Sequence, residues 1–168
     1  NGLVEGNTFY RNQGAAIQIE GGAESRWAEG MGVSNLVIRD NMFDTCDVND
    51  WRKGVIYVST YLPTGPTDYP MFRNLLFEEN TFIDVPRRAV IVRSAENVVI
   101  RANTFKNPTT RKRNNYERST IKVELSSNIV VADNTWVESP YIEYIEVDAD
   151  NKTVKGLVET GNSIVGEL

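Results

Sequence analysis

Three carboxylates and a tryptophan lie within ten residues of one another: Glu20, Glu24, Trp27 and Glu29. Paired carboxyl groups perform general acid–base chemistry, and the hydrolysis of a glycosidic bond needs two of them. A flat indole face beside carboxylates is also typical of a site that binds sugar hydroxyls and the C–H face of a sugar ring. Glu20, Glu24 and Glu29 are therefore the candidate catalytic groups.

Composition excludes several other kinds of chemistry. The chain has no His, which excludes a Ser-His-Asp triad, a histidine general base and a His-rich zinc site. A net charge of −5 argues against nucleic acid as a partner, and no apolar run approaches the length of a membrane span. Asp44, Asp47 and Asp50 lack the glycine and distal glutamate of a calcium loop. We expect no metal site and no cofactor.

An internal repeat predicts which elements position these side chains. In five segments two Asn residues lie six positions apart, and an aromatic residue follows two positions after the second Asn; a sixth segment is degenerate. The segments are 1–9, 35–43, 74–82, 97–105, 128–136 and 156–164. A second alternating strand follows at variable distance in five of them, at 16–20, 55–59, 89–93, 120–124 and 144–148. Such periodic units are typical of a solenoid.

The repeat predicts an all-β chain: a right-handed, single-stranded parallel β-helix of about six coils, forming one domain over residues 1–168. The second Asn of each unit is expected in left-handed geometry at a bend, stacked into a hydrogen-bonded ladder. Its members are Asn7, Asn41, Asn80, Asn103, Asn134 and Asn162. An inward aromatic stack is expected from Phe9, Phe43, Phe82, Phe105 and Trp136.

The second strand of each coil predicts a binding face. Alternation places Ile and Val inward and leaves an outward column, which we aligned as Gln18/Glu20, Tyr57/Ser59, Ile91/Arg93, Lys122/Glu124 and Glu146/Asp148. Inserted loops on both sides carry Trp27, Glu29 and Trp51. The candidate substrate-binding residues are Gln18, Glu20, Trp27, Glu29, Trp51, Tyr57, Arg93, Lys122 and Glu124.

Each of these candidates also has a structural interpretation. Trp27 and Trp51 are large enough to pin their loops onto the coils, without any contact to a ligand. Glu20, Arg93 and Glu124 equally suit a ladder of charges that stabilises neighbouring strands. The sequence leaves both interpretations open.

The segment GAAIQIEGGAESRWAEGMGVSNLVIRDNMFDTC, residues 14–46, resembles the C-terminal coils of bacterial β-helical exo-α-1,3-galactosidases, which act on blood-group-B-type glycans. The similarity runs from about Asn1 to Phe105 and rests on the coil rhythm with Glu20, Trp27, Glu29 and the turn at 41–43. It implies a pectin-lyase-like fold and a glycan substrate. It also implies a catalytic pair of adjacent Asp residues, but the chain has no Asp-Asp dipeptide. The pair is then expected upstream of residue 1, and this piece is expected to be inactive alone.

Two other functions fit the same fold. A polysaccharide lyase acting on a uronate-containing glycan would use Arg93 or Lys122, and it is the one alternative in which Ca²⁺ would be a cofactor. A non-catalytic β-helix would serve binding or structure. By resemblance, we expect a secreted, periplasmic or cell-surface protein. We also expect end-to-end self-association through the first coil, whose strand edges would be unpaired.

Overall fold

The computed structural model describes residues 1–24, 27–28, 30, 32–48, 54–62, 65, 67–85, 88–108, 119–139 and 145–166. For strand residues 23, 24, 27, 28, 61, 119, 145 and 146 it describes the backbone alone. All regular structure in these ranges is β-strand. Over the same ranges there is no helix with the length and apolar character needed to cross a membrane.

The strands form three long sheets, which we name A, B and C. Sheet A contains β1 (Gly2–Glu5), β5 (Ser34–Arg39), β8 (Phe72–Glu78), β11 (Ala95–Arg101), β14 (Ser127–Ala132) and β17 (Lys155–Thr160). Sheet B contains β2 (Thr8–Tyr10), β6 (Met42–Asp44), β9 (Thr81–Ile83), β12 (Thr104–Lys106), β15 (Thr135–Val137) and β18 (Ser163–Val165). Sheet C contains β3 (Ile17–Glu24), β7 (Ile56–Tyr61), β10 (Val90–Arg93), β13 (Ser119–Glu124) and β16 (Ile145–Ala149), with β4 (Trp27–Ala28) antiparallel to β3.

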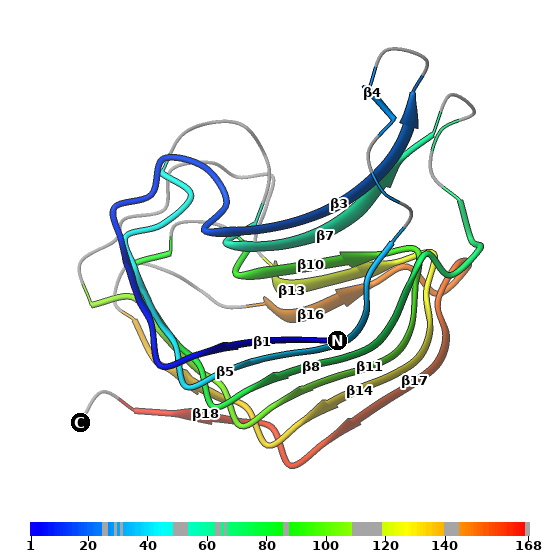
Figure 1. Cartoon of the computed structure of the whole chain (residues 1–168). Helices are drawn as coiled ribbons and strands as arrows, with labels where there is room; N and C mark the ends of the chain where they lie inside the picture. Colours follow the sequence, from blue (N-terminus) through cyan, green and yellow to red (C-terminus); the bar gives the residue numbers. More distant parts are fainter. Residues whose placement is uncertain are drawn as a thin grey trace.

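The chain passes from sheet A to sheet B to sheet C and then starts the next coil. Every strand of one coil pairs in parallel with the equivalent strand of the next coil, for example β8 with β11 and β10 with β13. Figure 1 shows the strands of sheet C stacked above those of sheet A, with the coils following one another from the N-terminus to the C-terminus. The predicted parallel β-helix is therefore confirmed.

The predicted Asn ladder is present and runs through all six coils. Each ladder Asn accepts, at its Oδ1 atom, hydrogen bonds from both the backbone N–H and the Nδ2 of the Asn one coil earlier, as Asn103 does from Asn80 at 3.0 Å for each. The same pair of bonds links Asn7 to Asn41, Asn41 to Asn80, Asn103 to Asn134 and Asn134 to Asn162. Because the four central members Asn41, Asn80, Asn103 and Asn134 are buried, each unmade bond there would be costly.

The prediction that the ladder Asn itself has left-handed geometry is wrong. The positive φ angles fall on the residue before it, in Gly6, Asp40, Glu79, Ala102, Asp133 and Gly161. The preceding residue makes the bend, and this leaves the ladder Asn free to direct its N–H and its amide along the stack. The first Asn of the unit does adopt positive φ, as at Asn35, Asn74, Asn97 and Asn128. Its side chains form a second, exposed ladder that starts at Asn1.

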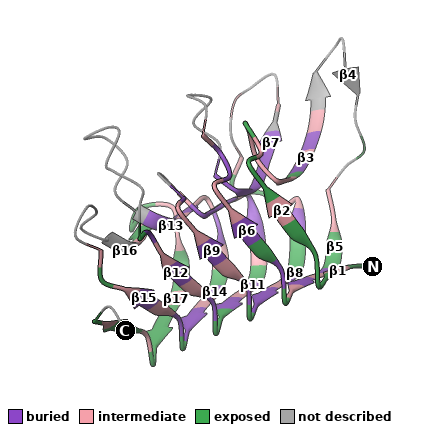
Figure 2. Ribbon diagram, turned by 90° about the vertical axis from the view of Figure 1, so that its left-hand side faces the viewer, coloured by how far each residue is buried: buried purple, intermediate pink, exposed green. Residues whose placement is uncertain are grey.

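The aromatic stack is also confirmed. The rings of Phe9, Phe43, Phe82, Phe105 and Trp136 lie face to face, with centroids 4.9–5.1 Å apart and interplanar angles of 12–18°. Figure 2 shows the strands of sheet B side by side along the stack, with β2 at the N-terminal end largely exposed.

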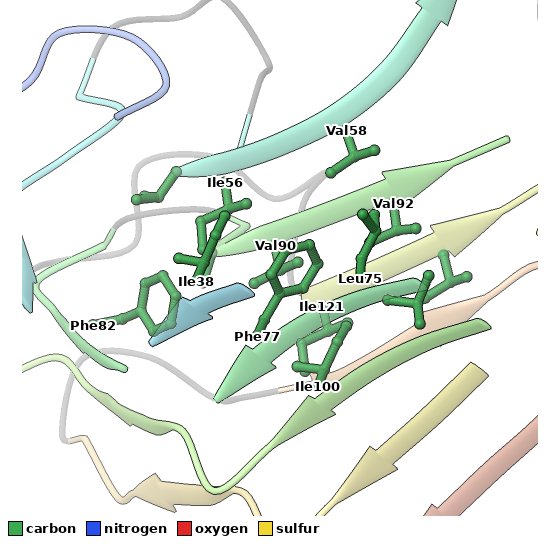
Figure 3. Packing of buried hydrophobic residues seen from close by; sticks show 14 of the residues in the cluster. Ile38, Ile56, Val58, Leu75, Phe77, Phe82, Val90, Val92, Ile100 and Ile121 are labelled. Carbon is green, nitrogen blue, oxygen red and sulfur yellow. The ribbon is translucent and has the colours of Figure 1, made fainter. Parts of the chain in front are cut away.

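The rest of the core lies between sheets A and C. Ile38, Phe77 and Ile100 of sheet A face Val58, Val90 and Ile121 of sheet C, and all six are at most 1% exposed (Figure 3). Alternation along each strand of sheet C therefore leaves its other side chains on the outside of the coil.

Candidate functional site: the outer face of sheet C

The outward side chains of sheet C line up in one continuous row across five strands. Its members in order are Gln18, Tyr57, Ile91, Lys122 and Asp148. Two positions further along the strands, Glu20 lies beside Ser59 on one side of the sheet, and Arg93 lies beside Glu124 on the other. The first four strands thus have the predicted alignment.

The fifth strand differs from our alignment by two residues. The predicted alignment places Lys122 beside Glu146, whereas in the structure Lys122 pairs with Asp148 and Val123 pairs with Ala149. The backbone N–H of Asp150 donates to the carbonyl of Val123 at 3.2 Å, in agreement with this register. A shift of two residues keeps inward residues inward, so the hydrophobic pattern of the sequence could not reveal it.

The row is open at one end and covered in its centre. Gln18 on β3 is exposed, whereas Tyr57 is 4% and Ile91 1% exposed although both point out of the coil. Tyr57 therefore presents no open ring face to solvent in this structure. The polar groups of this face lie on both sides of Tyr57 and Ile91, on β3 and on β10 and β13.

Arg93, Lys122 and Glu124 form a compact ion-paired group, which we call the charged trio. Nε of Arg93 lies 2.5 Å from Oε2 of Glu124, and Nζ of Lys122 lies 2.9 Å from Oε1 of the same carboxylate. Lys122 also approaches Asp148 at 3.9 Å. The three side chains are only 18–29% exposed, so they are less screened by water than a surface ion pair.

Both carboxylate oxygens of Glu124 are therefore engaged by cations. Burial acts to raise the pKa of Glu124, but hydrogen bonds from Lys122 and Arg93 and their positive charges outweigh it, so the pKa is lowered. A general acid in glycoside hydrolysis needs a raised pKa. Glu124 is thus an ionised hydrogen-bond acceptor and organises the cations around it.

Glu20 lies on β3, at the opposite side of the sheet from the charged trio. Its carboxylate accepts a hydrogen bond from Nε2 of Gln18. Two other strands, β7 and β10, separate β3 from β13, so at about 4.8 Å per spacing the backbones of Glu20 and Glu124 lie roughly 14 Å apart. The two carboxylates are held by different partners: Gln18 holds that of Glu20, and Arg93 and Lys122 hold that of Glu124.

The remaining candidates are Glu24, Trp27, Glu29 and Trp51. Glu24 ends β3 and is paired with Trp27 of β4 in a short antiparallel hairpin, which rises above sheet C in Figure 1. Glu29 and Trp51 lie outside the described residues. The roles of these four residues stay a prediction.

Two glycines fix the path of the chain after the hairpin. Gly32 has φ +72°, and a Cβ at this position would lie 1.9 Å from the carbonyl oxygen of Met71. A Cβ at Gly21 would lie 3.1 Å from the backbone nitrogen of Gly32. The backbone at Gly32, which follows the hairpin, therefore lies in close contact with Gly21 of β3 and with Met71 before β8.

This face can hold a polar ligand through charged and amide groups at its two sides: Gln18 and Glu20 at β3, and the charged trio at β10 and β13. Carboxylates accept hydrogen bonds from sugar hydroxyls, while Arg and Lys donate to ring and hydroxyl oxygens. Glu124, which is ionised and held by two cations, is not suited to be the general acid of this face.

Comparison with known proteins agrees with the resemblance found in the sequence. No family model matches the chain. It is 29% identical over 104 residues to alpha-1,3-galactosidase A from two strains of Bacteroides fragilis, a match that covers 61% of this chain and 17% of the galactosidase. Its fold matches the surface protein and adhesin PfbA of Streptococcus pneumoniae with a TM-score of 0.63 and 16% identity, over 99% of this chain and 39% of PfbA. The chain is thus similar in sequence to a small part of a bacterial α-1,3-galactosidase and shares the parallel β-helix fold with an adhesin.

Proposed function

We propose that this chain is part of a glycoside hydrolase that removes terminal α-linked galactose, and that the outer face of sheet C binds the glycan. The observation that carries the proposal is the charged trio on a face whose other side holds Gln18 and Glu20. The similarity to alpha-1,3-galactosidase A supplies the sugar and the linkage. The galactosidase is several times longer than the matched segment, so its activity is part of the proposal.

The catalytic carboxyl pair belongs, in this proposal, to coils that precede Asn1 in a longer polypeptide. Two findings support this. The strands that carry Glu20 and Glu124 are three strand spacings apart, and the pKa of Glu124 is lowered by its hydrogen bonds to Lys122 and Arg93. This chain then contributes one wall of the binding site. An extracellular or cell-surface location follows from the same relatives, and it is proposed with the function.

A polysaccharide lyase is less well supported by the charged trio. Such an enzyme needs a base and free positive charge to face a uronate. Arg93 and Lys122 are both ion-paired with Glu124, so neither is a free positive charge. A non-catalytic binding module would use the same face without any cleavage.

Binding to this chain tests the proposal. We expect α-1,3-galactobiose to shift the amide NMR signals of Gln18, Ile91, Lys122 and Glu124. Glu124→Gln should weaken this binding by roughly ten-fold, because it releases Arg93 and Lys122 from their positions. Lys106→Gln, on the outside of sheet B, is the matched control and should change nothing.

Two outcomes would contradict the proposal. If polygalacturonate shifts these amides and galactobiose does not, and if Arg93→Ala abolishes the release of products that absorb in the ultraviolet, the lyase is correct. If neither glycan shifts them, sheet C is not a glycan-binding face.

A further inference from the structure

A second depression lies at the corner where the strands of sheet C turn into sheet A. It has a volume of about 410 Å³ and lies in the later coils. Three segments line it: Thr67 and Asp68 from the loop after β7, residues 125–127 at the turn into β14, and Lys152, Thr153 and Lys155 at the turn into β17. We call it the corner pocket. None of its residues is among the candidates predicted from the sequence.

Hydrogen bonds hold the three walls of the corner pocket together. Oγ of Ser94 donates to the carbonyl oxygen of Thr67 at 2.5 Å, which fixes the first wall to the end of β10. The backbone N–H of Leu125 donates to Oγ1 of Thr153 at 3.1 Å, which joins the second wall to the third. Oγ of Ser126 bridges two coils, since it donates to the carbonyl of Glu124 and accepts from the N–H of Ala95.

The turn that carries the lysines is also fixed. Oδ1 of Asp150 accepts from the N–H of Lys152 at 3.0 Å, and Oδ2 accepts from the hydroxyl of Thr153 at 2.9 Å. These two bonds lower the pKa of Asp150, so it is ionised at neutral pH and keeps the turn closed. The pocket is thus preformed, which lowers the entropic cost of binding.

The cations of the corner pocket differ from those in the ion pairs of the coils. Arg39, Arg93, Arg101 and Lys122 each contact a carboxylate within 3 Å. Lys152 and Lys155 have no ion pair with any described residue, and Asp68 has none either in that part of the chain. The residues that line the pocket are two lysines and one aspartate, a net charge of +1, and the ionised Asp150 in the same turn partly offsets the charge of Lys152.

This lining matches one chemical class of ligand. Two ammonium groups suit a single carboxylate, and the hydroxyls of Thr67 and Ser127 with the carboxylate of Asp68 suit the hydroxyls of a pyranose ring. A volume of about 410 Å³ falls in the range of sites that enclose a small ligand, and it exceeds that of one sugar ring.

The corner pocket adjoins the outer face of sheet C. Leu125, in its wall, directly follows Glu124, and Ser94, which anchors Thr67, directly follows Arg93. We propose that the corner pocket binds an acidic sugar residue, such as a uronic acid, of the glycan that lies on this face. The inference rests on the proposed function, since it supposes that the ligand of the neighbouring face is a glycan.

An NMR titration of the chain with glucuronate, glucose and acetate tests this inference. Glucuronate should shift the amides of Thr67, Lys152, Thr153 and Lys155, with an affinity roughly ten-fold higher than that of glucose. Lys152→Gln and Lys155→Gln should each weaken glucuronate several-fold, and the double variant should bind it no better than glucose. Lys106→Gln is the control with the same loss of charge outside the pocket, and it should bind glucuronate as the unaltered chain does.

Three other outcomes overturn the inference, and a fourth overturns the proposed function instead. If acetate binds as tightly as glucuronate, the pocket is an anion site without sugar recognition. If glucose and glucuronate bind equally, the lysines do not select an acid. If glucuronate shifts no amide of the corner pocket while α-1,3-galactobiose still shifts those of Ile91 and Lys122, this inference fails and the proposed function stands. If glucuronate shifts the corner-pocket amides and galactobiose shifts none, the acidic-sugar pocket stands and the galactose site is refuted.

Discussion

Nε of Arg93 lies 2.5 Å from Oε2 of Glu124, across the parallel pair β10 and β13, and Lys122 binds the other oxygen of the same carboxylate. The arrangement places two cations and one anion on a face that the repeat pattern points away from the core. It also fixes the charge state of Glu124, and this decides which chemistry the face can support.

Glu124→Gln should change the acid stability of the chain. Because the pKa of Glu124 is lowered in the folded state, the carboxylate stabilises the fold above its unfolded-state pKa, and this contribution is lost as the pH falls through the folded-state pKa. We expect the variant to be less stable by roughly 1 kcal/mol at pH 7. The difference should narrow below about pH 4.5, where the unfolded carboxyl becomes protonated. Urea unfolding at several pH values measures it, and a gap that widens toward acid would refute it.

Asn80→Ala should be far more damaging than a change in the exposed ladder. Asn80 is 1% exposed, and its loss leaves the N–H of Asn41 and the carbonyl of Ile38 without their bonds inside the coil. We expect a loss of about 3 kcal/mol in unfolding free energy. Asn97→Gly, which keeps the positive φ of an exposed ladder residue, should cost less than 1 kcal/mol. Equal losses in urea unfolding would contradict the distinction between the ladders.

Phe82→Leu tests the aromatic stack. Phe82 contacts a ring on each side, at 4.9 Å to Phe43 and 5.0 Å to Phe105, and it is buried. Each stacked pair contributes about 0.5–1.5 kcal/mol beyond burial, so we expect a loss of about 2 kcal/mol or more. Phe9→Leu removes one ring contact from a half-buried end position and should cost roughly half as much. Thermal unfolding compares the two variants, and an equal or larger loss at Phe9 would count against the stack.

Gly32→Ala should disrupt the return of the chain beside β3. The added Cβ would lie 1.9 Å from the carbonyl oxygen of Met71, at a positive φ that Ala adopts poorly. We expect a loss of more than about 2 kcal/mol, with shifted amide signals for Gly21 and Met71. Gly30→Ala is the matched control, because a Cβ there meets nothing within 4 Å. A Gly32 variant as stable as the Gly30 variant would show that the close approach is not required.

Much of the fold could be predicted from the repeat. The spacing of the two Asn residues and the aromatic predicted the buried ladder and the stack, because each column contains the same residue type in nearly every coil. The sequence did not reveal that the residue before each ladder Asn has the positive φ angle. The residues at this position, such as Gly6, Asp40, Glu79 and Ala102, share no residue type that would indicate left-handed geometry.

The site was less predictable than the fold. Alternation predicts the outward direction of Lys122 and Glu124, but it does not predict that the outward side chains of Tyr57 and Ile91 are buried. The register of β16 could not be predicted either, because a shift of two residues keeps the inward residues inward. The corner pocket was missed because its residues come from three insertions between repeats. The available signal in the sequence was the closely spaced Asp150, Lys152, Thr153 and Lys155 between two predicted strands.

End-to-end association through the first coil stays a prediction. Leu3 and Tyr10 are 57% and 56% exposed on β1 and β2, whose outer edges pair with no strand among the described residues. Sedimentation of the chain at increasing concentration measures it. A strictly monomeric chain would contradict it.

The central claim is tested most directly by measuring galactose release from an α-1,3-galactoside. A polypeptide that extends this chain with the coils before Asn1 should release galactose, and Glu124→Gln in that polypeptide should raise KM roughly ten-fold with little change in kcat, because Glu124 organises binding and not bond cleavage. The chain of residues 1–168 alone should release none. Release by the chain alone would show that it holds its own catalytic pair, and no release by the extended polypeptide would refute the galactosidase.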